Sequence, residues 1–251
     1  MKIKSILVSQ PPPADIQKSP YNKLIDKYKI SVDYFKFIKI DGIPSKEFRQ
    51  ARVNILDYSA VIFTSRQAVD HFFRIAKEVR ANIPEDMKYF CISESTAYYL
   101  QNYVQYRKRK IFHGKQSFAD LMEVIRKHKD NKFLFPCSEI HKQDIPNALE
   151  KEGIEFEKAV IYRTLACDLS KIDITSYDML VFFSPSGIKS LFKNFPDFEQ
   201  GEQAIATFGK TTAEAAKSAG LKIQVNAPTP KAPSMSMSIE QYVKDSNKRK
   251  R

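Results

Sequence analysis

Turns that carry serine or threonine recur along this sequence, each directly after a run of β-branched or aromatic residues. They stand at 9–10, 64–65, 93–96, 136–139, 184–187 and 209–212. A helical pattern follows most of them, so each turn would present unpaired backbone N–H groups and the positive end of a helix dipole. Such places bind carboxylates or phosphates. The simpler interpretation, that each hydroxyl only caps its helix, stays open for any single turn but does not explain why both halves keep the pattern.

The usual signatures of nucleotide, metal and nucleophilic chemistry are missing. With seven glycines the chain has no GxGxxG, no GxxxxGK[ST] and no G-x-S-x-G motif. No two cysteines have C-x-x-C spacing, and the cysteines and histidines are far apart in sequence: Cys91, Cys137, Cys167, His71, His113, His128 and His141. We therefore expect no cofactor, no metal and no disulfide framework. Any catalysis has to come from hydroxyls, backbone dipoles and shape.

Composition and charge restrict the class of protein further. The 251 residues allow one large domain or two small ones, and 43% of them are hydrophobic. No apolar run approaches a membrane span or a signal-peptide core, so we expect a cytoplasmic protein with no membrane contact. Of the net charge of +12, the run 107–110 and the tail 244–251 each supply +4. Two short clusters make nucleic acid an unlikely partner; the tail is expected to be a frayed, solvated end.

Strand-like and helical patterns alternate almost to the end of the chain, which is typical of an α/β protein with parallel sheets. The expected strands are 3–8, 32–40, 60–64, 88–92, 132–135, 156–163, 179–183, 204–208 and 222–225. The expected helices are 66–79, 95–103, 118–128, 142–151, 188–194 and 212–219, the last one ending at Gly220.

An internal repeat organises these elements. The segment YSAVIFTSRQAVDHFF resembles YDMLVFFSPSGIKSLF and places Ser65 and Ser184 119 residues apart. The next strand and helix repeat too, with Thr96 and Thr212 116 residues apart. The second half lacks a fourth strand, which the segment KSILVSQPPP near the N-terminus can supply. We therefore predict a discontinuous domain of residues 1–31 and 166–251 with a second domain, 41–158, inserted in it.

Two long strands bracket the inserted segment and lack a helix directly after them. We expect residues 32–40 and 159–165 to form a two-stranded β hinge between two similar three-layer α/β domains. If the domains face each other across this hinge, all six turns line one cleft, because ligands bind beyond the carboxyl ends of parallel strands.

The motifs VIFTSRQAV, FFSPSGI, ATFGKTTAEAAKSAGL and VNAPTPKAPSM, in this order, resemble the uroporphyrinogen-III synthase family. The resemblance runs from about residue 55 to 243 and implies two α/β domains on a two-stranded hinge. It also implies a reaction, in which hydroxymethylbilane loses water and closes to uroporphyrinogen III with its last ring inverted, through a spiro intermediate. The substrate is a linear tetrapyrrole with eight carboxylates. No cofactor is implied, and a monomer is expected.

The resemblance also assigns roles to residues. Tyr162 matches the family's candidate acid for the departing hydroxyl, which suits a phenol whose pKa is near 10; an aromatic residue packed at the hinge is the other interpretation. The positions expected to bind substrate are Ser65, Arg66, Thr96, Ser184, Ser186, Gly187, Lys210, Thr211 and Thr212.

The chain departs from the family pattern at two basic positions. Arg66 directly follows Ser65, where the family often has another residue before its arginine, and Lys210 stands where proline is common. Either residue could contact a carboxylate or remain solvated. The run 107–110 has no family counterpart and receives no role. The alternative function is a regulatory module on the same scaffold, sensing a polyanion or binding nucleic acid through the basic tail.

Overall fold

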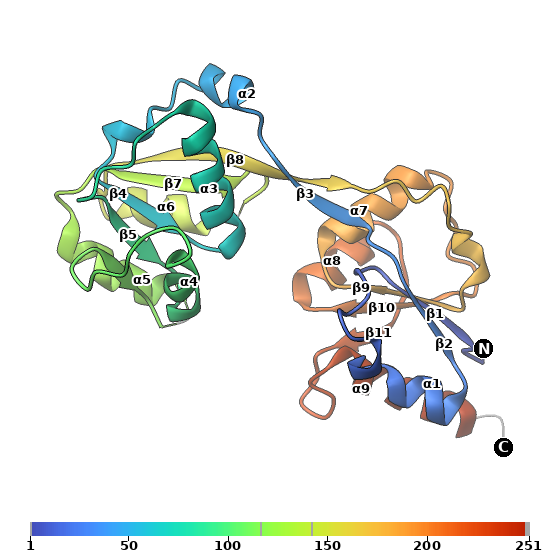
Figure 1. Ribbon diagram of the computed structural model, residues 1–251. Helices are drawn as coiled ribbons and strands as arrows, with labels where there is room; N and C mark the ends of the chain where they lie inside the picture. Colours follow the sequence, from blue (N-terminus) through green and yellow to red (C-terminus); the bar gives the residue numbers. More distant parts are fainter. Residues whose placement is uncertain (1, 116, 142, 249–251) are drawn as a thin grey trace. The chain divides into compact units, whose positions relative to one another are not determined.

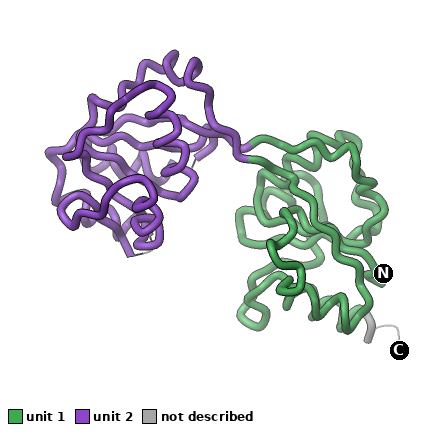
Figure 2. The backbone as a smooth tube through the Cα atoms, viewed as in Figure 1, with its two compact units in different colours: residues 1–39, 165–251 green, residues 40–164 purple. Residues whose placement is uncertain are grey.

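The structure is a computed structural model, and it describes residues 2–115, 117–141 and 143–248. The chain divides into two compact units (Figures 1 and 2). Unit 1 combines Met1–Lys39 with Leu165–Arg251, and unit 2 is Ile40–Thr164. The chain therefore passes from one unit to the other twice.

Unit 1 is built on a parallel sheet in the order β11-β10-β9-β1-β2. Its strands are β1 (Ser5–Val8), β2 (Ser31–Tyr34), β9 (Met179–Phe182), β10 (Ala204–Phe208) and β11 (Ile223–Ala227). Its helices are α1 (Asn22–Tyr28), α7 (Pro185–Asn194), α8 (Lys210–Ser218) and α9 (Met235–Lys248), with 3-10 turns at Ile16–Lys18 and Ile174–Ser176.

Alternate side chains of these strands enter two separate cores, because successive residues of a strand point to opposite faces of the sheet. Ile6 of β1 packs with Leu24 of α1 and Ile239 of α9 on one face. Leu7, its neighbour, lies in the other core with residues of α7 and α8, such as Leu191. The result is a three-layer sandwich with helices on both faces of the sheet (Figure 1).

Unit 2 repeats this arrangement around strands in the order β3-β8-β7-β4-β5-β6. The strands are β3 (Ile38–Gly42), β4 (Ala60–Phe63), β5 (Lys88–Cys91), β6 (Ile111–His113), β7 (Phe133–Ser138) and β8 (Phe156–Ala166). The helices are α2 (Ser45–Gln50), α3 (Arg66–Val79), α4 (Glu94–Leu100), α5 (Phe118–Ile125) and α6 (Asp144–Lys151), with 3-10 turns at Ile55–Asp57 and Arg126–His128. Helices α2, α3 and α4 share one core, and α5 and α6 share the other.

The expected class, α/β with parallel sheets, is confirmed. The expected single strand 32–40 is wrong, because it consists of β2 and β3, which belong to different sheets. The break lies at Phe37, which is buried against Phe182 at a ring distance of 5.8 Å. The Phe37 carbonyl accepts hydrogen bonds from Ser190 Oγ and from the backbone N–H of Cys167, the residue that follows β8.

The expected frayed tail is also wrong over its described part. Helix α9 continues to Lys248, and residues 249–251 lie outside the described residues. The helix is held by Ile239 and Val243, which are buried in the core of unit 1. Its buried Glu240 accepts a hydrogen bond from Tyr28 and forms ion pairs with lysines of α1 and α9.

Glu240→Gln is expected to lower the melting temperature of the protein at pH 7 by about 2–4 °C. The hydrogen bond from Lys23, supported by Lys244 and Tyr28, lowers the pKa of the Glu240 carboxyl from 4.5 to about 2. A depressed pKa contributes stability above the unfolded value and loses it as the pH falls through the folded value. The difference between the variant and the wild type in thermal unfolding should therefore shrink as the pH falls from 4.5 toward 2. The exposed Glu202, changed to Gln, provides the control; a difference that persists at pH 2 would contradict this explanation.

Candidate functional site

A cavity of about 350 Å³ lies in unit 2 at the carboxyl ends of strands β4, β5 and β7, beside Tyr162 of β8. Its lining is Thr64, Ser65, Ile92, Phe135, Cys137, Ser138, Ile140, His141, Ile145 and Tyr162. The cavity therefore brings together two of the predicted turns, 64–65 and 136–139, with the predicted acid Tyr162. A largely apolar cavity with a few convergent polar groups is the usual form of a small-molecule site.

Tyr162 occupies a fixed place beside β7. It pairs in register with Ser138, and its carbonyl accepts a hydrogen bond from the backbone N–H of Glu139 at 3.0 Å. Its hydroxyl oxygen lies 3.5 Å from Ser65 Oγ, at the long end of hydrogen bonding. Burial raises the pKa of the Tyr162 phenol above its ordinary value of 10, while the hydrogen bond with Ser65 acts in the opposite direction. The phenol thus carries its proton at neutral pH.

Ser65 begins helix α3. Its backbone is extended, and its Oγ accepts a hydrogen bond from the backbone N–H of Ala68 at 3.1 Å, as in an ordinary N-cap. The same oxygen is the neighbour of the Tyr162 hydroxyl. Ser65 therefore caps the helix, and its hydroxyl also lies beside the Tyr162 phenol near the positive end of the α3 dipole.

His71 is a member of this site that the sequence did not reveal. Its ring stacks on that of Tyr162 with 5.2 Å between the centroids and 20° between the planes. Its Nδ1 accepts a hydrogen bond from Arg74 Nε at 3.2 Å. Burial, and then the charge of Arg74, lower the pKa of His71 below 6.5, so the ring is neutral at pH 7. No motif marks His71, because its partner Tyr162 lies 91 positions along the chain and meets it only through folding.

His141 is the second residue that the sequence analysis passed over. Its Nδ1 lies 3.0 Å from the Ser138 carbonyl, and its ring meets Phe135 edge-on. Its Nε2 is buried and has no hydrogen-bond partner within the described part of the chain. Cys137, by contrast, is a poor nucleophile, because burial raises the pKa of its thiol to about 11.

Unit 1 carries a corresponding turn. Ser184 caps α7 by accepting a hydrogen bond from the backbone N–H of Gly187 at 3.2 Å, and Pro185 occupies the first turn. A side chain at Gly187 would come within 3.7 Å of the hydroxyls of both Ser9 and Ser184. The turns that follow β1 and β9 thus meet beside Gly187, with Ser9 and Gly187 buried and Ser184 half-buried. Ser186 is half-buried beside them.

The remaining predicted residues differ in exposure. Arg66 is exposed and lies 5.4 Å from the centre of the Tyr99 ring, while Lys210 and Thr211 are exposed at the start of α8. Thr96 and Thr212 are only 4% and 1% exposed. Their side chains lie within the units, below turns whose caps are other residues: Ser93 caps α4, and Gly209, with a φ of 85°, precedes α8.

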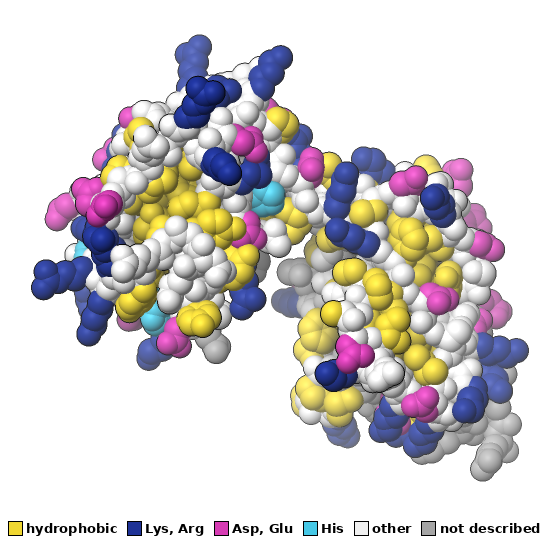
Figure 3. Space-filling model, viewed as in Figure 1, with side chains coloured by type: hydrophobic (Ala, Val, Ile, Leu, Met, Phe, Trp, Pro, Cys, Tyr) yellow, Lys and Arg dark blue, Asp and Glu magenta, His cyan; other side chains and the backbone are white. Residues whose placement is uncertain are grey.

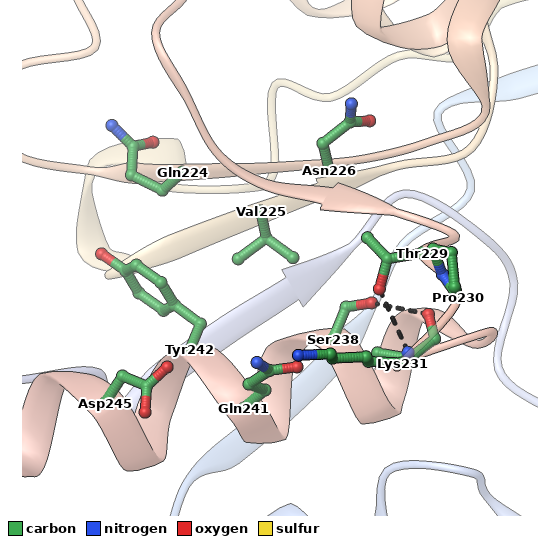
Figure 4. Close-up of a pocket in the computed structure, with 11 residues that line it drawn as sticks. Gln224, Val225, Asn226, Thr229, Pro230, Lys231, Ser238, Gln241, Tyr242 and Asp245 are labelled. Atoms are coloured by element: carbon green, nitrogen blue, oxygen red, sulfur yellow. Dashed lines mark hydrogen bonds between the residues drawn. The ribbon is translucent and has the colours of Figure 1, made fainter.

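Another cavity, of about 440 Å³, lies in unit 1 between β11, the turn at 229–232 and α9 (Figure 4). Val225 points from the strand toward α9, whereas Gln224 and Asn226 point to the other side. The hydroxyl of Thr229 is already bonded to the Ala232 N–H, and the Ser238 hydroxyl to the Ala232 carbonyl. Polar groups therefore do not converge in this cavity as they do around Tyr162.

The basic run 107–110 does not contribute to the cavity around Tyr162. It precedes β6, so it lies at the amino end of the strands, opposite the turns. Two of its members are held by Glu85: Arg107 pairs with the carboxylate at 3.5 Å, and Lys110 donates to the carbonyl. On the face shown in Figure 3, Lys and Arg side chains are spread over both units rather than gathered into one stripe.

Fold and site together define an α/β protein of two parallel-sheet units with hydroxyl-bearing turns at the carboxyl ends of the strands. The family model of uroporphyrinogen-III synthase HemD matches residues 19–236. The chain belongs to the uroporphyrinogen-III synthase family, and it is an enzyme of haem biosynthesis.

Individual relatives agree with this assignment. The uroporphyrinogen-III synthase of Schizosaccharomyces pombe is 24% identical over 260 residues, covering 95% of this chain and 96% of that protein. The structure of the synthetase from Helicobacter pylori has a TM-score of 0.60 at 19% identity, covering 96% of this chain and 99% of that one. A mutant synthase from Thermus thermophilus has a TM-score of 0.57 at 15% identity, with the same coverage. None of these proteins favours the alternative of a regulatory module. No helix among the described residues could cross a membrane.

The Tyr162 phenol is expected to titrate above pH 10, because burial outweighs its hydrogen bond with Ser65. Ultraviolet absorbance of tyrosinate, recorded for the wild type and for Tyr162→Phe during an alkaline titration, isolates this group as a difference. The control is Tyr98→Phe, since Tyr98 is 74% exposed in the same unit. A Tyr162 difference that develops together with that of Tyr98 would show that burial does not hold the proton.

Proposed function

We propose that this chain is a hydro-lyase that cyclises hydroxymethylbilane to uroporphyrinogen III, with Tyr162 as the acid and the serine- and threonine-bearing turns as carboxylate sites. The reaction removes the terminal hydroxyl of a linear tetrapyrrole as water and closes the ring with its last pyrrole inverted. Family membership supports the reaction, and the geometry around Tyr162 supports the division of roles.

One observation carries the role of Tyr162: a phenol that holds its proton at neutral pH stands in a cavity beside the capping hydroxyl of a helix. Burial keeps the proton on the oxygen until substrate arrives. When the proton passes to the departing hydroxyl, the carbon–oxygen bond breaks and water leaves. Ser65 and the positive end of α3 then stabilise the phenolate. Two opposing effects thus act on the Tyr162 phenol. Burial keeps the proton on the oxygen, and Ser65 with the positive end of α3 stabilises the phenolate once the proton has left.

The carboxylates of the substrate require many contacts rather than one strong one. In unit 2 we assign Ser65 and Arg66 to this role, and in unit 1 Ser184, Ser186, Gly187, Lys210 and Thr211. The backbone N–H groups at the starts of α3, α7 and α8 supply the direct contacts. Thr96 and Thr212, whose side chains are covered, support their turns from below. Holding the chain in one geometry supplies much of the rate and selects the inverted isomer.

The working state we propose is a cytoplasmic monomer. The three cysteines are free thiols, as is usual in a reducing compartment. The net charge of +12 attracts a substrate with eight carboxylates, so association should be faster at low ionic strength.

Hydroxymethylbilane supplied to the wild type should yield uroporphyrin III after oxidation, whereas the solution without protein yields isomer I. Tyr162→Phe should lower kcat by about 10²-fold or more, the usual contribution of a general acid. KM should change little, because the ring and its packing remain. The isomers are separated chromatographically, and rates are taken from the same samples.

Tyr98→Phe, remote from the cavity, is the matched variant and should keep the wild-type rate. Only isomer I from the wild type would end the proposed function. A Tyr162→Phe enzyme that retains full turnover to isomer III would remove Tyr162 from the acid role while leaving the function in place.

A further inference from the structure

The Tyr162 ring has to be held in place by neighbouring residues that take no part in the reaction. Its hydroxyl has one long contact, to Ser65 at 3.5 Å, which alone fixes neither the ring nor its degree of burial. The face of the ring is covered by His71, which projects from α3 one and a half turns after Ser65 and stacks on it at 5.2 Å. His71 therefore limits, in part, the access of water to the Tyr162 ring.

His71 is in turn held by Arg74, one turn further along α3. Arg74 Nε donates to His71 Nδ1 at 3.2 Å, so the remaining proton of the neutral imidazole lies on Nε2. The guanidinium also donates to the carbonyls of Ile161 at 3.2 Å and Ile43 at 2.9 Å. Its last contact is an ion pair of 2.6 Å with Glu78. The arginine thus ties the helix to the backbone of the residue that precedes Tyr162.

Gly42 is the residue that admits this guanidinium. A Cβ built at Gly42 would lie 2.6 Å from Arg74 Cζ and 2.7 Å from Nε, closer than such contacts occur in proteins. The φ of Gly42 is not positive, so glycine is not needed here for an unusual backbone conformation. It is needed because any larger residue would place a Cβ where the guanidinium lies. The last residue of β3 therefore lacks a side chain at the point where Arg74 passes.

The charges around the stack favour a neutral imidazole. Burial and Arg74 lower the pKa of His71, and Asp70 and Asp41 oppose them. On the side of Tyr162 the neighbouring titratable groups are Cys137, whose thiol stays protonated because it is buried, and His141, which lines the same cavity. A neutral ring covers the phenol without placing next to it a positive charge that would help it to lose its proton.

We propose that His71, set by Arg74 in the space left by Gly42, is a positioning residue that aims the Tyr162 phenol and keeps it protonated until substrate binds. The proposal rests on the proposed function, in which Tyr162 is the acid. His71 acts through Tyr162 and makes no contact with substrate.

The test compares His71→Ala, His71→Phe and Gly42→Ala in the full chain. His71→Ala uncovers the phenol, so the tyrosinate difference assigned to Tyr162 should move down toward pH 10. It should also lower kcat by about tenfold, with KM within about twofold. His71→Phe restores an aromatic cover and should return both readouts to near the wild type. Gly42→Ala leaves both rings in place but displaces the guanidinium, and should shift both readouts in the same direction as His71→Ala by a smaller amount.

His128→Ala is the matched control, because His128 packs at a tilt against Phe112, with 4.4 Å between the ring centres, and does not line the cavity of Tyr162. An unchanged Tyr162 titration and an unchanged kcat in His71→Ala would overturn the proposal. If that variant does not fold, Gly42→Ala decides, and wild-type values there overturn it equally. Failure of the proposed function is a separate result, because it appears as isomer I from the wild type, whereas the alkaline titration reports on the stack without any substrate.

Discussion

Parallel strands end at one edge of a sheet, and every helix that starts there leaves backbone N–H groups without partners. Much of the structure follows from this constraint. Ser65 and Ser184 each satisfy one of these groups by accepting a hydrogen bond from the residue three positions on. The other N–H groups at the helix starts remain available to bind an anion at the same edge of the sheet. A chain whose turns are short, polar and repeated in both units can therefore bind a polyanion with its backbone, and needs few cationic side chains there.

The proposed acid, Tyr162, differs from this diffuse binding, since its role depends on single atoms. Burial keeps the proton on its hydroxyl, and in the proposed reaction Ser65 and the helix dipole would accommodate the phenolate after transfer. Its support reaches back through His71 and Arg74 to Gly42, so three elements, β8, α3 and β3, contribute to the surroundings of one phenol. Tyr162 could be interpreted as an aromatic residue that only packs, but its neighbours give it surroundings that suit the role proposed for it.

The sequence predicted the parts of this structure that depend on local patterns. The helix over 66–79 and the strand over 204–208 have the predicted bounds, because apolar spacing and a serine cap or a glycine mark their ends. The break between β2 and β3 could not be predicted, since residues 32–40 show continuous strand propensity. Only the tertiary burial of Phe37 and the two hydrogen bonds to its carbonyl interrupt it.

In the candidate site, too, some residues could be predicted from local patterns and others could not. Ser65 and Ser184 follow from their place after a strand, and the motif order pointed to Tyr162. His71 and His141 received no role from the sequence, because their partners are distant in sequence: Tyr162 for one, and the wall of a folded cavity for the other. The prediction of a frayed basic tail was wrong because it rested on charge alone. Ile239 and Val243, which precede the tail, are buried in the core and hold α9 in place.

The central claim is that main-chain amides at the helix starts, rather than the basic clusters, bind the carboxylates. The most direct measurement is an amide ¹H–¹⁵N correlation spectrum of the full chain titrated with uroporphyrin III, the oxidised product. The largest shifts are expected at residues 65–68, 184–187 and 209–212. Shifts confined to the run 107–110 and the residues from 244 onward, with the helix starts unmoved, would contradict it.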